Sequence, residues 1–239
     1  MYSKTSAAVG TDIKRPSLTG IHLEIYSDTV RASACDAFRM AVTEIKCNCG
    51  GKMSVTVPKQ SFFYLANAVE DKDLLEFGLN ANTLVFIKSD MLFSTRIISE
   101  PFMNIDRLLN MPDKMLVAKI KANDMKTMAE TVSMITNVSE DTAPVLLKFK
   151  NNNLQLSIES TEAESTLNVP IESVNMISGE FYYNAKYFSD MLKVIRGDVD
   201  VYMTKRGILY ASNPVSEYML TNSKKRSVKR KSKKTKKAA

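Results

Sequence analysis

The sequence predicts an α+β fold in which one strand-and-helix unit occurs twice. Similar blocks begin at Ile21 (IHLEIYSDTVRASACDAFRMAVTEI) and at Val145 (VLLKFKNNNLQLSIESTEAESTLNV), an offset of about 125 residues. Each block alternates apolar and polar residues, as half-buried strands do, and each contains a polar turn, at 27–28 and at 151–153. An amphipathic stretch with helical spacing follows each block. With 239 residues, of which 44% are hydrophobic and 25% charged, the chain has the composition of one large or two small folded domains.

In the first unit the block predicts consecutive strands from Ile21 onward. A helix over 58–69 is predicted next, because apolar residues recur at helical spacing; they are Phe62, Leu65, Ala66 and Val69. Alternating segments then predict strands over 74–79, 84–88 and 91–98.

The second unit has an opening that the first largely lacks. It begins with a predicted strand over 116–120 and a helix capped by Asn123, whose apolar stripe is Met125, Met128, Ala129, Val132 and Ile135. After the second block come a helix over 184–195 and strands over 198–203, 208–211 and 217–221. Only residues 1–12 stand in the place of an opening strand and helix in the first unit. The sequence therefore predicts an uncovered sheet edge and an uncovered apolar groove there, unless another chain fills them.

Charge divides the chain into a body and a tail. The formal net charge is +7, but ten of the 33 basic residues lie within the last sixteen positions, and the rest of the chain is slightly acidic. The sequence predicts a disordered segment over 223–239, because such a lysine run cannot bury a core. Its functional interpretation is a sequence-independent phosphate anchor, and its alternative is a solubilising tail. The basic residues assigned to this role are Lys224, Lys225, Arg226, Lys229, Arg230 and Lys231.

Several classes of function are disfavoured. No apolar run approaches the ~20 residues that a membrane helix needs, and no secretion signal is visible, so we expect a cytoplasmic protein with no membrane partner. Cys47 and Cys49 could suggest a metal, but only the distant Cys35 and His22 remain to complete a four-ligand site. His22 has no paired nucleophile in the sequence pattern. We therefore expect no metal, no cofactor and no catalytic residue.

Four segments carry recognisable motifs in a fixed order. They are 11–20 (TDIKRPSLTG), 34–41 (ACDAFRMA), 94–109 (STRIISEPFMNIDRLL) and 183–192 (YNAKYFSDML). The first is similar to T-D-x-x-R-P-x-L-x-G, a motif of the bacterial beta sliding clamps, and the others are similar to later motifs of that family. The chain thus resembles the middle and C-terminal domains of the beta subunit of DNA polymerase III. The family's N-terminal domain has no counterpart in this sequence.

The resemblance implies a duplicated DNA-clamp fold with antiparallel sheets and with helices that face a DNA channel. Residues 1–112 would be a middle-type domain without its opening strand and part of its first helix, and 113–222 would be a C-terminal-type domain. The implied function is that of a bacterial or phage processivity factor, a non-catalytic subunit that holds the replicative polymerase on duplex DNA. Its partners would be duplex DNA, the polymerase, the clamp loader, and further copies of this chain or another clamp chain. Three copies would supply six units for a ring, although the shortened first unit argues against a self-sufficient one.

Two sites follow from the resemblance. Helix cations that would face DNA are Lys59, Lys126, Lys186, Lys193 and Arg196. A hydrophobic pocket between the two domains would receive short peptides of partner proteins; its residues are Arg15, Leu18, Cys35, Ala37, Phe38, Arg39, Met40, Met103, Arg107, Leu108 and Met219. Without the family, Leu18, Met40 and Leu108 would be interpreted as ordinary core.

The chain departs from the family at three places in this pocket. Ala37-Phe38 replaces a Gly-His pair, 102–104 replaces F-P-D, and 221–224 replaces M-P-x-R-L. An altered peptide preference is therefore expected. The alternative function is a clamp-derived adaptor that binds partner peptides or nucleic acid without forming a ring.

Overall fold

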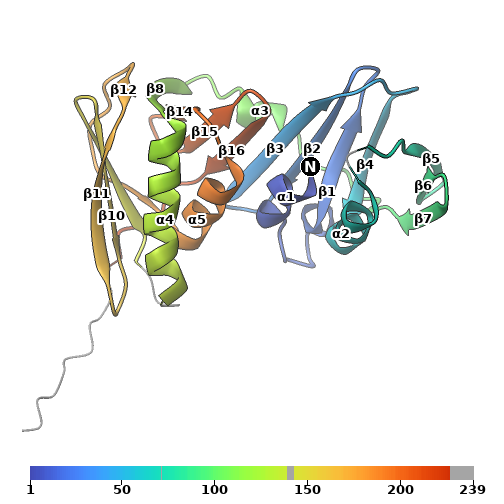
Figure 1. The fold of residues 1–239 in the computed structure, drawn as a ribbon, viewed down its shortest axis with the longest axis horizontal. Helices are drawn as coiled ribbons and strands as arrows, with labels where there is room; N and C mark the ends of the chain where they lie inside the picture. The colour runs from blue at the N-terminus through green and yellow to red at the C-terminus, as the bar shows by residue number, and fades with distance from the viewer. Residues whose placement is uncertain (71, 139–142, 227–239) are drawn as a thin grey trace, which may run out of the picture. The chain divides into compact units, whose positions relative to one another are not determined.

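The computed structural model describes residues 1–226 except 71 and 139–142. It divides into two compact units (Figure 1). Unit one contains residues 1–112 and 214–219, and unit two contains residues 113–213 and 220–239. The predicted α+β fold is confirmed, because antiparallel sheets and helices occur in both units. None of the described helices is long and apolar enough to cross a membrane.

Unit one is built on an antiparallel sheet in the order β3-β2-β1-β4. Its strands are β1 (Gly20–Ile25), β2 (Thr29–Cys35), β3 (Arg39–Lys46) and β4 (Met53–Pro58). The alternation from Ile21 predicts the first three of these strands, whereas β4 was not predicted. The alternation of β1 places Ile21, Leu23 and Ile25 in the core, as expected for a strand with one buried face.

Close packing at the start of β1 requires glycine. Gly20 lies opposite Pro58 in the pairing of β1 with β4. A Cβ atom at Gly20 would lie 2.6 Å from the carbonyl oxygen of Val57 and 2.8 Å from the Ile98 Cδ1 and Thr56 Cγ2 atoms. Such distances are shorter than van der Waals contact, so no other residue fits without moving the backbone.

The remaining elements of unit one are short. They are α1 (Tyr2–Thr5), η1 (Ser6–Ala8), η2 (Pro16–Thr19), α2 (Lys59–Ala68), β5 (Glu76–Asn80), β6 (Thr83–Lys88), β7 (Met91–Arg96) and α3 (Asp106–Leu109). Phe62 and Leu65 of α2 are buried as the spacing predicts, whereas Ala66 is exposed. Strands β5, β6 and β7 form a separate antiparallel sheet.

Unit two repeats this plan with a longer opening. Its elements are β8 (Met115–Ile120), α4 (Ala122–Val138), β9 (Val145–Lys150), β10 (Asn153–Glu159), β11 (Glu164–Pro170), β12 (Glu172–Ser173), β13 (Phe181–Tyr183), α5 (Ala185–Val194), β14 (Val199–Met203) and β15 (Leu209–Asn213). One sheet has the order β11-β10-β9-β13, and β8 pairs with β14, which pairs with β15. The apolar faces of α4 and α5 pack between these layers against Leu147, Leu154 and Val201.

The predicted cap of α4 is wrong. Asn123 lies inside the helix, which begins at Ala122. Asp198 takes the capping role from a distant loop, because its Oδ1 accepts a hydrogen bond of 3.0 Å from the Ala122 backbone N–H. Its Oδ2 lies 2.9 Å from Lys121 Nζ, and these two contacts hold the pKa of the Asp198 carboxyl below its usual value.

The two units differ where the sequence predicts a difference. In unit two, β8 covers one edge of β14, and α4 packs along α5. In unit one, β5 pairs only with β6 among the described strands, and α1 has four residues. Around β5–β7, Leu74, Leu79, Ile87 and Leu92 are exposed. Unit one therefore presents an unpaired strand edge beside exposed apolar side chains.

The last strand, β16 (Ser216–Leu220), returns to unit one through residues 214–219. The Val215 carbonyl accepts hydrogen bonds from the Glu44 N–H and the Thr43 hydroxyl, both at 3.0 Å. Ser216 Oγ donates to Thr43 Oγ1 at 3.0 Å. This segment was expected in the second domain, because strand pairing over such a chain separation leaves no local pattern in the sequence.

Candidate DNA-facing groove and partner-binding surface

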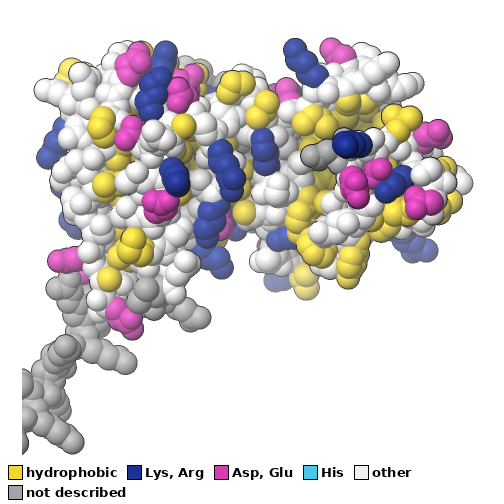
Figure 2. All heavy atoms as spheres, viewed as in Figure 1, with side chains coloured by type: hydrophobic (Ala, Val, Ile, Leu, Met, Phe, Trp, Pro, Cys, Tyr) yellow, Lys and Arg dark blue, Asp and Glu magenta, His cyan; other side chains and the backbone are white. Residues whose placement is uncertain are grey.

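A groove between α4 and α5 carries the strongest concentration of the predicted DNA-facing residues. Its volume is about 480 Å³, and Lys126, Lys193 and Arg196 all line it. The floor is apolar; it consists of Met125, Ala129, Leu192 and Ile195, and the cations stand on the rim. Dark-blue Lys and Arg side chains gather over the region of α5 in Figure 2.

Local contacts within each helix help to position the charged side chains of the groove. Lys126 and Glu130 are four residues apart on α4, so they share one face, and their charged atoms lie 3.8 Å apart. Arg196 follows the end of α5, where its Nε donates a 3.4 Å hydrogen bond to the Lys193 carbonyl. The groove is thus lined by three cations and one carboxylate. It suits a polyanion held by exposed charges rather than a buried, tightly bound ligand.

The other two predicted DNA-facing lysines do not line this groove. Lys186 is exposed in the first turn of α5, seven residues before Lys193 and therefore on nearly the same helix face. Lys59 is exposed at the first position of α2 in unit one. Among the described residues, no cluster of three His, Cys, Asp or Glu side chains could hold a metal ion.

The predicted peptide-binding residues all fall in unit one, because Met219 belongs to the segment that returns there. We call this set the partner-binding surface. Phe38 and Met103 are its large exposed apolar members, at 56% and 42% exposure. Met40 and Met219 are buried, so they support the surface from below. Arg15, Ala37 and Arg107 are exposed, and Leu18 and Leu108 are half-buried.

A tight hairpin turn between β2 and β3 presents Phe38. Asp36 Oδ1 accepts backbone hydrogen bonds from Phe38 at 2.7 Å and from Arg39 at 2.9 Å. Asp36 Oδ2 also lies 3.0 Å from Nε of the buried Arg39 side chain. Because one carboxylate fixes three donors, the turn is rigid and the Phe38 ring is held toward solvent.

Two further contacts bring Met103 and Leu18, which also belong to the partner-binding surface, near this turn. The Cys35 thiol lies 3.1 Å from Met103 Sδ, and burial raises the pKa of this thiol to about 12. Gly10 N–H donates to the Leu18 carbonyl at 2.8 Å. A Cβ atom at Gly10 would lie 3.4 Å from Leu18 Cβ and 3.6 Å from Asp36 Cβ, so Leu18 is close to the same turn.

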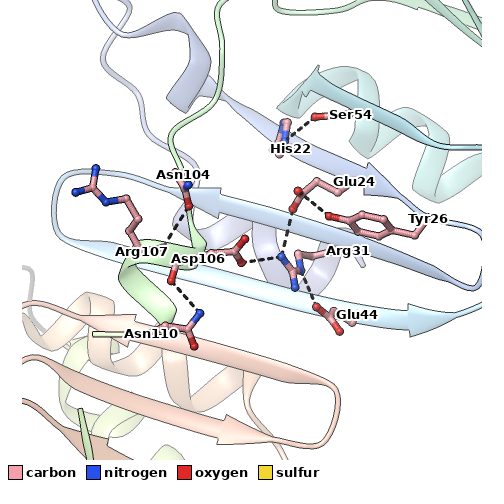
Figure 3. A network of polar contacts seen from close by, with 10 residues as sticks. All are labelled: His22, Glu24, Tyr26, Arg31, Glu44, Ser54, Asn104, Asp106, Arg107 and Asn110. Atoms are coloured by element: carbon pink, nitrogen blue, oxygen red, sulfur yellow. Dashed lines mark hydrogen bonds and ion pairs between the residues drawn. The ribbon is translucent and has the colours of Figure 1, made fainter. Parts of the chain in front are cut away.

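A charge network that the sequence pattern does not predict holds α3 in place at one end of the partner-binding surface. Arg31 of β2 lies 2.6 Å from Glu44, 3.5 Å from Glu24 and 3.0 Å from Asp106 of α3 (Figure 3). Asp106 precedes Arg107, whose side chain points away from the network in Figure 3. The pKa of Arg31 is raised despite partial burial, because hydrogen bonding and charge from Glu44 favour its protonated form. This network anchors α3 on the sheet through Asp106. The Arg107 side chain takes no part in these ion pairs and points away from them (Figure 3).

The base of the predicted basic tail is attached to β13. The backbone of Tyr182 pairs with Asn222 and Ser223, and Lys225 Nζ lies 3.8 Å from Glu180. Lys148, at 2.7 Å, and Tyr182 also bind Glu180, and these contacts lower the pKa of its carboxyl to about 2. Lys224 and Arg226 are exposed, whereas Lys229, Arg230 and Lys231 lie outside the described residues.

Comparison with solved structures identifies the class to which this fold belongs. The sliding clamp of Bacillus subtilis superimposes with a TM-score of 0.81 at 18% identity, over 94% of this chain and 61% of that one. The beta subunit of the Streptococcus pyogenes DNA polymerase superimposes with a TM-score of 0.78 at 19% identity, over 93% of this chain and 62% of that one. The fold is therefore that of a sliding clamp.

Sequence comparison finds similarity to one family over part of the chain. Residues 1–104 match the family model described as DNA polymerase III beta subunit, central domain. The beta sliding clamp of Bacillus subtilis is 26% identical over 217 residues, which are 82% of this chain and 53% of the relative. The beta sliding clamp of Synechocystis is 24% identical over 207 residues, which are 79% of this chain and 52% of the relative. The chain is thus similar to the bacterial beta sliding clamps, the family whose motifs it resembles, and it spans about half the length of the curated relatives that it matches.

Proposed function

We propose that this chain acts in DNA replication as a sliding clamp subunit, which tethers the replicative polymerase to duplex DNA. The observation that carries the proposal is the cationic groove between α4 and α5, on a fold shared with sliding clamps. The role is that of a non-catalytic accessory subunit in the cytoplasm of a bacterium, encoded by the cell or by a phage.

The groove suits contact with DNA that must also slide. Lys126, Lys193 and Arg196 offer charge to phosphates, which are identical at every base pair, so the contacts carry no sequence information. Lys126 is largely exposed, and exposed ion pairs are weak and screened by salt. Weak, repeated contacts of this kind permit movement along the duplex.

Retention on circular DNA tests the proposal directly. We expect the full chain, assembled on a nicked circular duplex, to stay bound during gel filtration in moderate salt and to be released when the circle is linearised. The physical reason is that a closed ring is held by topology, whereas phosphate contacts alone dissociate as salt rises. Equal release from circular and linear DNA would contradict a ring.

A second candidate is an adaptor that binds partners without encircling DNA. The unpaired edge of β5 favours it, because an open sheet edge and exposed apolar residues interrupt the plan seen in unit two. Light scattering separates the candidates: an assembly of about three times the 26.7 kDa chain supports a ring of six units. A monomer at all concentrations supports the adaptor.

We further propose that the partner-binding surface receives an extended peptide with one or two large apolar anchors. Phe38 and Met103 supply exposed apolar area, while Arg15 and Arg107 form a polar rim. Methionine adapts its shape to different ligands, which a docking site shared by several partners requires.

Replacing Phe38 by alanine is expected to weaken binding of such a peptide by about fivefold or more, because exposed aromatic anchors dominate interface energies. Fluorescence anisotropy with a labelled peptide that ends in Leu and Phe measures the change. Tyr64→Ala is a matched control, since Phe38 and Tyr64 are both 56% exposed in unit one. Equal weakening by both variants would contradict this assignment of the surface.

A further inference from the structure

Cys47 and Cys49 form a pair of thiols that the clamp function does not use. They lie in the loop between β3 and β4, and one residue separates them. Their sulfur atoms are 2.9 Å apart. A disulfide bond is about 2.04 Å long, so the two side chains already face each other, and bond formation requires a small further approach.

The backbone holds both cysteines in place. The Cys47 N–H donates to the Asp28 carbonyl at 3.0 Å, and the Cys49 N–H donates to the Ser27 carbonyl at 2.9 Å. Both hydrogen bonds attach the loop to the turn between β1 and β2. The main chain at both cysteines is therefore held in place, which lowers the backbone entropy lost when the thiols join.

Access differs sharply between this pair and the third cysteine. Cys47 and Cys49 are half-exposed, whereas Cys35 is buried against Met103. Burial and the hydrogen bond between Cys47 and Cys49 raise the pKa of the Cys47 thiol to about 11. Reagents in solution can therefore reach this pair more easily than they reach Cys35.

A complete metal site around the pair is not present among the described residues. A structural zinc site needs four ligands, and no group of three metal-binding side chains is present in the described part of the chain. Two accessible, adjacent thiols are instead suited to oxidation. A disulfide across a single intervening residue closes a small ring, and strained or exposed disulfides are the readily reduced ones.

We propose that Cys47 and Cys49 are a modification site, at which a small-molecule disulfide such as glutathione disulfide oxidises the pair to a reversible intramolecular disulfide. The thiolate of one cysteine attacks one sulfur of glutathione disulfide, which breaks the S–S bond and releases one glutathione. The other cysteine then attacks the sulfur of the first in the mixed disulfide and releases the second. Two cysteine thiols are oxidised, one glutathione disulfide is reduced to two thiols, and the two cysteine protons pass to the glutathione products.

The test is oxidation of the full chain in glutathione buffers of increasing oxidising strength, followed by acid quenching, denaturing alkylation with a maleimide and intact-mass analysis. The reduced chain takes up three maleimide groups, one for each cysteine. The oxidised chain is expected to lose the mass of two hydrogen atoms and to take up one group, on Cys35. Dithiothreitol is expected to restore all three.

Single serine variants supply the controls. Cys35→Ser is expected to form the disulfide as the unaltered chain does. Cys47→Ser and Cys49→Ser cannot complete the second step, so each is expected to retain a glutathione adduct or free thiols. The proposal is overturned by a stable glutathione adduct on the unaltered chain, by a disulfide that includes Cys35 or links two chains, or by three free thiols in the most oxidising buffer.

Discussion

Replacing Lys126, Lys193 and Arg196 together by alanine is expected to weaken binding to duplex DNA by at least about tenfold at low salt. All three line the groove between α4 and α5, so their removal leaves Glu130 as its only charged lining residue. The slope of log affinity against log salt concentration should also become shallower by about 0.9 for each phosphate contact that is lost. Fluorescence anisotropy with a labelled duplex across a salt series measures both effects.

A matched variant distinguishes the groove from overall charge. Lys119, Lys150 and Lys205 are exposed lysines of the same unit that do not line the groove. Their joint replacement by alanine changes the net charge equally and is expected to change the affinity much less. Both variants should be measured in the full chain and in a chain that ends at Asn222, because the tail lysines could mask the groove. An equal loss of DNA affinity in the two variants would contradict a specific role of the groove, because it would show that only the overall positive charge attracts DNA.

The second large effect is expected at Gly20. Gly20→Ala should lower the free energy of unfolding by about 2 to 3 kcal/mol, because the new Cβ atom overlaps the Val57 carbonyl and two side chains. The change also lies beside η2, which holds Leu18 of the partner-binding surface. Urea unfolding followed by circular dichroism measures the loss.

Gly78→Ala is the control for this variant. Gly78 also lies in a strand of unit one, β5, but nothing is within 4 Å of the position that its Cβ atom would take. Alanine there is expected to change the free energy of unfolding by less than about 1 kcal/mol, in the stabilising direction. Similar destabilisation by the two variants would contradict the importance of the close contact at Gly20.

Local patterns account for the part of the fold that could be predicted. The alternation from Ile21 and from Val145 gives strands in both units, and the helix predicted over 184–195 is present as α5, with Met191 and Leu192 buried. These features depend on residues that are near neighbours in the chain, so the sequence displays them directly.

Features that depend on distant residues could not be predicted. Asn123 is a good capping residue by type, but Asp198, 76 positions away from Ala122, provides the cap. The Arg31 network likewise joins β2 to an aspartate that is 75 positions later. For the candidate site, the motifs select residues near the hairpin turn at Asp36. They do not reveal that Met219 is buried, whereas the burial of Met40 agrees with its alternative interpretation as core.

The return of residues 214–219 to unit one has a consequence for the order of folding. Thr43 pairs with Val215, 172 positions later, so unit one has contacts of very high sequence separation. During synthesis, a ribosome must finish nearly the whole of unit two before this strand can reach its place. Loop closure over such a distance slows folding, and β3 must wait with one edge open. Unit one is therefore expected to reach full protection from hydrogen exchange only after Met219 has left the ribosome.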